Sequence, residues 1–408
     1  MPGTLSRVPR PRSAAALLAA LLVLAGCGGS GDDDGGNETR TVVVPQVGVR
    51  GEEPEAATDL GFPAFATKNT TRVGSADPVA TAAAVSRAVF PGSEAADRPL
   101  AVVLVDKDDW QGGVAAAALM ADPTSAPILL TDGEKLPEAS KGALDALAPA
   151  GSREAGGAQV IRIGEVAKPE GLKSVDVRGR NGVVLAAAID AFLAAARGRT
   201  SDRVVIAATE RPELAAPAAG WAAKSGDPVL FTERDTLPPA TRQALVRHQQ
   251  PQIYVLGDEK TVSPAVEKEL KRLGTVKRID GASTDPVANS VAFSRYVDAS
   301  FGWGVVVPGQ GFVFINAERP MDAVAAAPLS ASGTYGPQVL HDGAPKLARP
   351  LESYLLDLQP GYRRDPARGV YNRGWVIGDE KAMSVATQAR IDALLEIVPE
   401  ETDSSPSS

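Results

Sequence analysis

The sequence contains one cysteine and two histidines, and each shortage excludes a class of chemistry. Cys27 has no second cysteine to pair with, so no internal disulfide can form. An ordinary zinc site takes three or four ligands, mainly from cysteine and histidine, and His248 and His341 lie in no two-histidine helical motif. The shortages exclude a disulfide-stabilised fold and a zinc-dependent hydrolase.

Several sequence motifs of catalysis are also missing. No Gly-x-Ser-x-Gly or Ser-x-x-Lys motif lies between an expected strand and helix, and no phosphate-binding P-loop is present. Residues 178–182 place glycines before a helix, where an anion can bind, but lack the full dinucleotide fingerprint. Acids at 106–109 follow a strand and are read either as a cation site or as a solvated loop. We expect no enzyme activity, no metal and no cofactor.

Positive charge is also in short supply. The chain has 42 basic and 50 acidic residues, a formal net charge of −8. Residues 1–26 hold three arginines and no acid, so a chain cleaved before Cys27 carries −11. Proteins that bind nucleic acid present basic surfaces. We therefore expect no nucleic-acid partner.

The first 26 residues read as a lipoprotein signal peptide. Three arginines precede an apolar run at 14–25, which is too short to span a bilayer and ends Leu-Ala-Gly-Cys, resembling a bacterial lipobox. This predicts lipidation of Cys27; the alternative is an ordinary secretory signal in which Cys27 is incidental. Residues 27–61 are rich in Gly, Asp and Glu and predict a flexible linker, and 399–408 predict a disordered tail. The lipid would hold the protein on the extracytoplasmic face of the membrane.

Between linker and tail, one pair of apolar runs occurs three times. The first run of each pair begins with proline, at 127–131, 228–232 and 337–341. The second ends in glycine and an acid, at 160–165, 253–258 and 375–379. Helical segments alternate with these strands, which predicts repeated βαβ units. The expected fold class is α/β: three tandem Rossmann-like units with parallel sheets, at 62–174, 175–274 and 275–398.

Short motifs next to the repeats suggest a family. Asp-Pro-Val-Ala occurs at 77–80 and 285–288, and an element with arginine and glycine precedes each unit. With the proline strands, these motifs resemble the bacterial cell wall-binding repeat 2 family over about residues 65–397. The resemblance implies three copies around a pseudo-threefold axis. Pro78 and Pro286 replace the family's usual arginine, an acid replaces the second glycine of each Gly-Gly, and His341 replaces a threonine.

The resemblance implies a non-catalytic envelope lipoprotein that associates with an anionic cell-wall polymer or peptidoglycan. The alternative is a solute-binding lipoprotein of a transport system, which also combines a lipobox with parallel α/β domains but has two lobes around a cleft. An enzyme with an unrecognised site is the third class. Three similar units would favour the first of these.

The expected ligand residues are basic side chains at the unit junctions: Arg72, Arg178, Arg180, Lys277 and Arg278. Each precedes a helix, so its charge and the helix N-terminal N–H groups can converge on one anion. Repeated around a ring, such sites would bind a polymer multivalently. The alternative is that each arginine pairs with a neighbouring acid and binds nothing.

Overall fold

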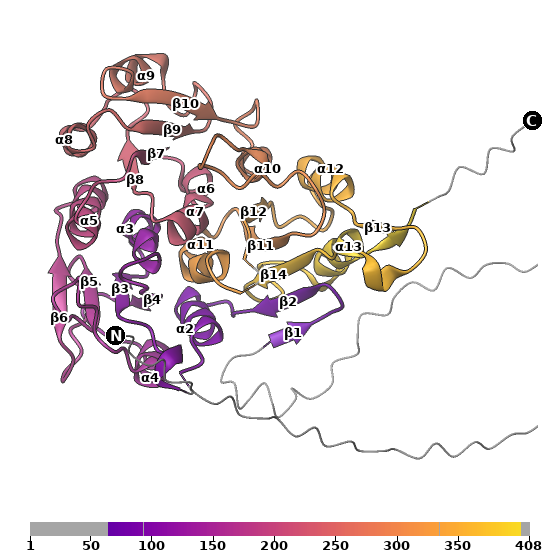
Figure 1. Ribbon diagram of the computed structural model, residues 1–408, viewed down its shortest axis with the longest axis horizontal. Coiled ribbons are helices and arrows are strands. Elements are labelled where there is room, and N and C mark those ends of the chain that lie inside the picture. Colours follow the sequence, from indigo (N-terminus) through magenta and orange to yellow (C-terminus); the bar gives the residue numbers. More distant parts are fainter. Residues whose placement is uncertain (1–63, 93, 334, 401–408) are drawn as a thin grey trace, which may run out of the picture. The chain divides into compact units, whose positions relative to one another are not determined.

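Three parallel sheets form the frame of the protein in the computed structural model, which describes residues 64–92, 94–333 and 335–400 (Figure 1). In each sheet the strand that follows a proline lies at one edge, the unit's first strand lies beside it, and the strand ending in glycine comes third. A fourth strand completes each sheet. The predicted α/β class with repeated parallel units is confirmed.

The first unit begins with a capped helix, α2 (Pro78–Val89). The Asp77 carboxylate accepts a hydrogen bond from the Val79 N–H at 3.0 Å, and Pro78 takes the first helical position. The sheet order is β4-β3-β5-β6. The other elements are η1 (Ala95–Asp97), β3 (Val102–Asp106), α3 (Trp110–Ala116), η2 (Ala117–Met120), β4 (Ile128–Thr131), α4 (Glu138–Leu147), β5 (Val160–Ile163) and β6 (Ser174–Val177).

The second unit repeats this order, with sheet β8-β7-β9-β10. Its central strand β7 is buried at every position but the first, as expected when helices cover both faces of a sheet. Its elements are α5 (Gly182–Arg197), β7 (Arg203–Ala208), α6 (Pro212–Ala215), α7 (Ala218–Ser225), β8 (Val229–Thr232), α8 (Pro239–Arg247), β9 (Gln252–Leu256), α9 (Pro264–Leu270) and β10 (Thr275–Ile279).

The third unit takes its fourth strand from the other end of the chain. Its sheet order is β12-β11-β14-β2, and β2 (Thr70–Val73) also pairs with the antiparallel β1 (Ala64–Ala66). We expected residues 62–174 to form the first unit, but 70–73 lie in the third sheet. The other elements are α10 (Pro286–Arg295), β11 (Gly311–Asn316), α11 (Pro320–Ala326), η3 (Ala327–Ser330), β12 (Gln338–His341), α12 (Arg349–Asp357), β14 (Arg373–Ile377) and α13 (Val385–Leu395).

One helix from each unit, which we call its second helix, packs against the second helices of the other two units: α3, α7 and α11. These helices are rich in alanine, which lets the backbones approach closely; a Cβ on Gly113 of α3 would lie 2.7 Å from the Val324 side chain of α11. The helix that begins each unit packs on a helix of the preceding unit: α5 on α3, α10 on α6, and α2 on α11, so the three units contact one another in a cycle. This cyclic packing is the expected pseudo-threefold relation.

An insertion at 359–372, ahead of β14, contains β13 (Gly361–Tyr362) and the short η4 (Pro366–Arg368). β13 pairs in parallel with β15 (Val398–Pro399), and the Glu400 N–H donates to the Tyr362 carbonyl at 2.8 Å. The first two residues of the expected disordered tail are therefore ordered by the insertion. The other expectations for the ends, including Cys27 and the linker, lie outside the described residues.

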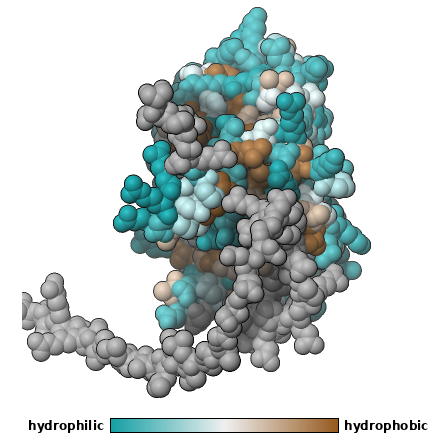
Figure 2. Space-filling model, turned by 90° about the vertical axis from the view of Figure 1, so that its right-hand side faces the viewer, coloured by the Kyte–Doolittle hydropathy of each residue, from teal (hydrophilic) through white to brown (hydrophobic). Residues whose placement is uncertain are grey.

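The side of the molecule seen in Figure 2 is largely hydrophilic. Apolar residues on this face are interrupted by hydrophilic ones. In the described part of the chain, no helix is both long enough and apolar enough to cross a membrane.

Candidate functional site

The predicted site residues lie where each fourth strand leads into the next unit's first helix. We call these places the β2–α2, β6–α5 and β10–α10 junctions. At each, the helix N-terminus is capped by a side chain: Asp77, Asn181 and Asp285 accept hydrogen bonds from N–H groups of the first turn at 2.9–3.0 Å. Two of the three caps are carboxylates, so these N-termini already have an anionic partner.

Arg72 of β2 is 7% exposed and points into the third unit. Its guanidinium donates to the carbonyls of Gly378, Asp379 and Met383 at 2.7–3.0 Å, and to Gln388 Oε1 at 2.9 Å. Burial lowers the pKa of the Arg72 guanidinium. Arg72 therefore holds the turn after β14, where Gly378 adopts a φ of +92° that favours glycine.

Arg278 of β10 makes the same connection in the second unit. It donates to the carbonyls of Gly257 at 2.8 Å and Val262 at 3.0 Å, and pairs with Glu267 at 2.6 Å. Arg72 lies beside Val376 of β14, and Arg278 lies beside Val255 of β9. The two arginines are equivalent, and each ties the turn of the glycine-ending strand to the fourth strand.

The first unit supplies the same guanidinium from the neighbouring strand. Asp176 of β6 occupies the equivalent position, beside Arg162 of β5. Arg162 donates to Asp176 at 2.6 Å and to the Ala167 carbonyl at 3.0 Å. The sequence reasoning missed Arg162, although an arginine within the apolar strand 160–163 was a visible signal.

The other predicted residues are more exposed and do not converge. Arg178 pairs with Asp176 at 3.0 Å and with Glu165 at 3.4 Å, and its side chain is 61% exposed. Arg180 is exposed at the same junction. Lys277 lies at the β10–α10 junction and pairs with Asp298, which lowers the pKa of that carboxyl. For Arg178 and Lys277 the geometry favours the alternative in which the cation pairs within the protein, and ligand binding by all three stays a prediction.

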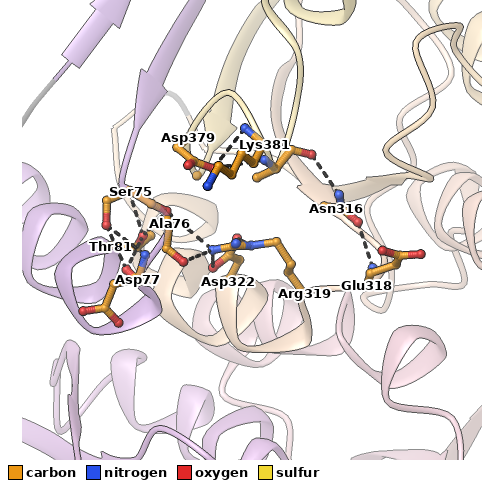
Figure 3. Close-up of polar contacts among 12 residues, drawn as sticks. Ser75, Ala76, Asp77, Thr81, Asn316, Glu318, Arg319, Asp322, Asp379 and Lys381 are labelled. Carbon is orange, nitrogen blue, oxygen red and sulfur yellow. Dashed lines mark hydrogen bonds and ion pairs between the residues drawn. The ribbon is translucent and has the colours of Figure 1, made fainter.

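At two of the junctions a further arginine contacts the backbone, and the sequence reasoning missed both of these residues. Arg319, before α11, donates to the Ala76 carbonyl at 2.9 Å and pairs with Asp322 at 2.6 Å (Figure 3). Burial raises the pKa of the Asp322 carboxyl even though Arg319 opposes this. Arg211, before α6, donates to the Thr284 carbonyl at 2.9 Å. Both follow from the repeated tripeptide Glu-Arg-Pro at 210–212 and 318–320, which was the available signal.

The two histidines are buried. His248, at the C-terminal end of α8, contacts Asp190 at 2.9 Å through Nε2 and the Ser201 carbonyl at 2.8 Å through Nδ1. His341 ends β12, where β4 and β8 end in threonine. Burial lowers the pKa of His341 to about 4, and its Nε2 has no hydrogen-bond partner among the described residues. His341 is therefore neutral at physiological pH.

The acids at 106–109 serve the local backbone. Asp106 accepts hydrogen bonds from the N–H groups of Asp108 at 2.8 Å and Gly133 at 2.6 Å, and Asp109 caps Gly112 at 2.9 Å. Within the part of the chain that the structure describes, no group of three or more His, Cys, Asp or Glu side chains is arranged to hold a metal ion. Asp106 and Asp109 therefore have backbone partners within this loop and at the start of α3.

Comparison with known proteins agrees with the fold and the repeats. Residues 177–267, which span most of the second unit, match the family described as Cell wall binding domain 2 (CWB2). The amidase enhancer of Bacillus subtilis (strain 168) is 32% identical over 121 residues, which are 30% of this chain and 16% of that protein.

Two solved structures share the fold. Cwp6 from Clostridium difficile aligns with a TM-score of 0.64 at 17% identity, over 82% of this chain and 51% of that one. Cwp8 from the same organism aligns with a TM-score of 0.60 at 19% identity, over 81% and 52%. The chain thus spans about half the length of each. The predicted family resemblance is confirmed for residues 177–267, which match cell wall binding domain 2, and the chain shares its fold with Cwp6 and Cwp8.

Proposed function

We propose that this protein is a non-catalytic envelope lipoprotein whose three repeats associate with an anionic cell-wall polymer. The observation that carries the proposal is the set of three equivalent parallel sheets around the mutually contacting helices α3, α7 and α11. Most of the second unit lies in the segment that matches the CWB2 family. A ring of similar units presents similar surfaces several times. Such repetition suits a repeating polymer, because linked weak contacts raise the overall affinity.

The membrane attachment in this proposal is a lipid on Cys27. It rests on the lipobox-like sequence at 24–27 and on the absence of any other cysteine. The protein would then contact both the membrane and the wall from the extracytoplasmic side, with the segment 27–61 as the spacer.

The alternative, a solute-binding lipoprotein, requires two lobes and a cleft at a hinge. The described residues instead form three units whose helices contact one another in a cycle. The N-terminal strand β2 pairs with β14 of the third unit. This arrangement favours the wall-binding proposal.

Co-sedimentation with purified cell walls tests the proposal. The full chain is produced with Cys27→Ser so that no lipid holds it to membrane fragments, and an acidic protein of similar charge gives the background. We expect retention on intact walls, release at high salt, and no retention on walls stripped of anionic polymers. Absence of retention on intact walls, or equal retention on stripped walls, would contradict the proposal.

A further inference from the structure

A polar pocket of about 420 Å³ lies between the first and second units, away from the three junctions. The end of α5 contributes Arg197 and Arg199, the start of β7 contributes Arg203, and the end of α7 contributes Lys224. The first unit contributes Asp122. Small-molecule sites usually measure about 300–1,000 Å³, so the pocket has room for a sugar-sized group.

One of the four cations is committed to the fold. Arg203 pairs with Asp227 at 3.0 Å. The Asp227 side chain is 1% exposed and also accepts hydrogen bonds from Trp221 Nε1 at 3.0 Å and the Ser201 hydroxyl at 2.9 Å. A buried carboxylate with this many donors is satisfied. The Arg203–Asp227 pair therefore leaves no net charge for a ligand.

The other three cations have no carboxylate in an ion pair among the described residues. Arg197 donates to the carbonyls of Asp122 at 3.0 Å and Gly226 at 2.6 Å, which fix its guanidinium without neutralising it. Arg199 is exposed, and the Lys224 ammonium lies 3.5 Å from the centre of the Tyr335 ring. The pocket also contains the carboxylates of Asp122 and Asp202, so cations exceed acids by one in a chain whose net charge is −8.

An aromatic ring, that of Tyr335, lies against one of these cations, Lys224, at the edge of the pocket. Tyr335 is 51% exposed and comes from the third unit, so residues from all three units meet here. An exposed aromatic ring offers apolar area to the C–H face of a sugar, while the arginine fork and the ammonium suit a phosphate or carboxylate. Cations near the C-termini of α5 and α7 also stabilise the helix dipoles, which is the competing explanation.

We propose that this pocket binds an anionic sugar unit, with the phosphate or carboxylate held by Arg199, Lys224 and Arg197, and the sugar placed beside Tyr335. The proposal deepens the proposed function, on which its biological meaning rests. It places the anion contact in the pocket between the first and second units, away from Arg72 and Arg278.

The test is calorimetric titration of the full Cys27→Ser chain with two probes, a glycerol phosphate oligomer and a glucuronic acid oligomer, which separate phosphate from carboxylate. The test variant is Arg199→Gln/Lys224→Gln. The control is Arg153→Gln/Arg364→Gln, which removes the same charge from exposed arginines outside the pocket. Thermal unfolding of both variants measures the effect on stability.

We expect saturable binding of at least one probe, weakened about tenfold or more in the test variant and less than threefold in the control. Binding that survives in the test variant, or no binding of either probe by the unmodified chain, would overturn the pocket. A loss of stability with unchanged binding would assign these cations to the helix dipoles instead. If the test variant is still retained on intact walls, the proposed function stands and the proposed ligand pocket is wrong. If neither the test variant nor the unmodified chain is retained, the proposed function itself is wrong.

Discussion

Replacement of Arg72 by glutamine distinguishes a structural arginine from a ligand-binding one. The guanidinium serves three backbone carbonyls and Gln388, all in a buried place. Each buried acceptor left without a donor costs about 1–3 kcal/mol, and glutamine can serve at most one or two of them. We expect the Arg72→Gln change to lower the free energy of unfolding by about 3–5 kcal/mol, similar to the cost of breaking other buried charged networks.

The assay is guanidinium chloride unfolding followed by tryptophan fluorescence, with Arg178→Gln as the matched control. Arg178 loses only exposed ion pairs, so its variant should remain within about 1 kcal/mol of the unmodified protein. An Arg72→Gln protein that unfolds at the unmodified midpoint would refute the reasoning. If that protein had also lost wall binding, Arg72 would be a ligand residue after all.

Three further predictions concern other parts of the chain. Burial is the largest single influence and disfavours a charged His248 ring, but the hydrogen bond to Asp190, the charge of Asp190 and the hydrogen bond to the Ser201 carbonyl together outweigh it and raise the pKa of His248. The contribution of the His248–Asp190 pair to the free energy of unfolding should therefore be complete below about pH 6.5 and fall as pH rises through the raised pKa. Urea unfolding at several pH values should show this decrease, and Asp190→Asn should make it smaller. Gly257 has a φ of +91° and a Cβ there would lie 2.9 Å from Thr261, so Gly257→Ala should lower the free energy of unfolding by about 1–3 kcal/mol. A Cβ on Gly142 in α4 would meet no atom within 4 Å, so Gly142→Ala should raise the free energy of unfolding by about 0.5–1 kcal/mol. Unfolding midpoints equal to that of the unmodified protein would contradict both predictions. Cys27→Ser should abolish labelling by a radioactive fatty acid, and persistent labelling would exclude Cys27 as the lipid site.

The repeated elements were predictable because strong local signals mark them. The proline strands and the glycine-ending strands are short, largely apolar runs, since helices cover both faces of their sheets. The Asp-Pro pairs at 77–78 and 285–286 cap and begin α2 and α10. These features depend on residues close in sequence, so one sequence is sufficient to find them.

The fourth strand of each sheet was not predicted. β6 and β10 have exposed or half-buried positions and carry Asp176, Lys277 and Arg278, so they lack an apolar run. The membership of β2 in the third sheet depends on ring closure over about 300 residues, which no local pattern encodes. The family resemblance drew attention to Arg72 and Arg278, but a motif alone does not separate an arginine that holds a turn from one that binds a ligand.

Titration of the full Cys27→Ser chain with polymer released from purified walls tests the central claim most directly. The account predicts saturable binding whose dissociation constant rises steadily with salt, because charge contacts weaken as screening shortens to about 8 Å at physiological ionic strength. Absence of saturable binding, or a dissociation constant that does not change between low and high salt, would contradict the claim that these repeats bind an anionic wall polymer.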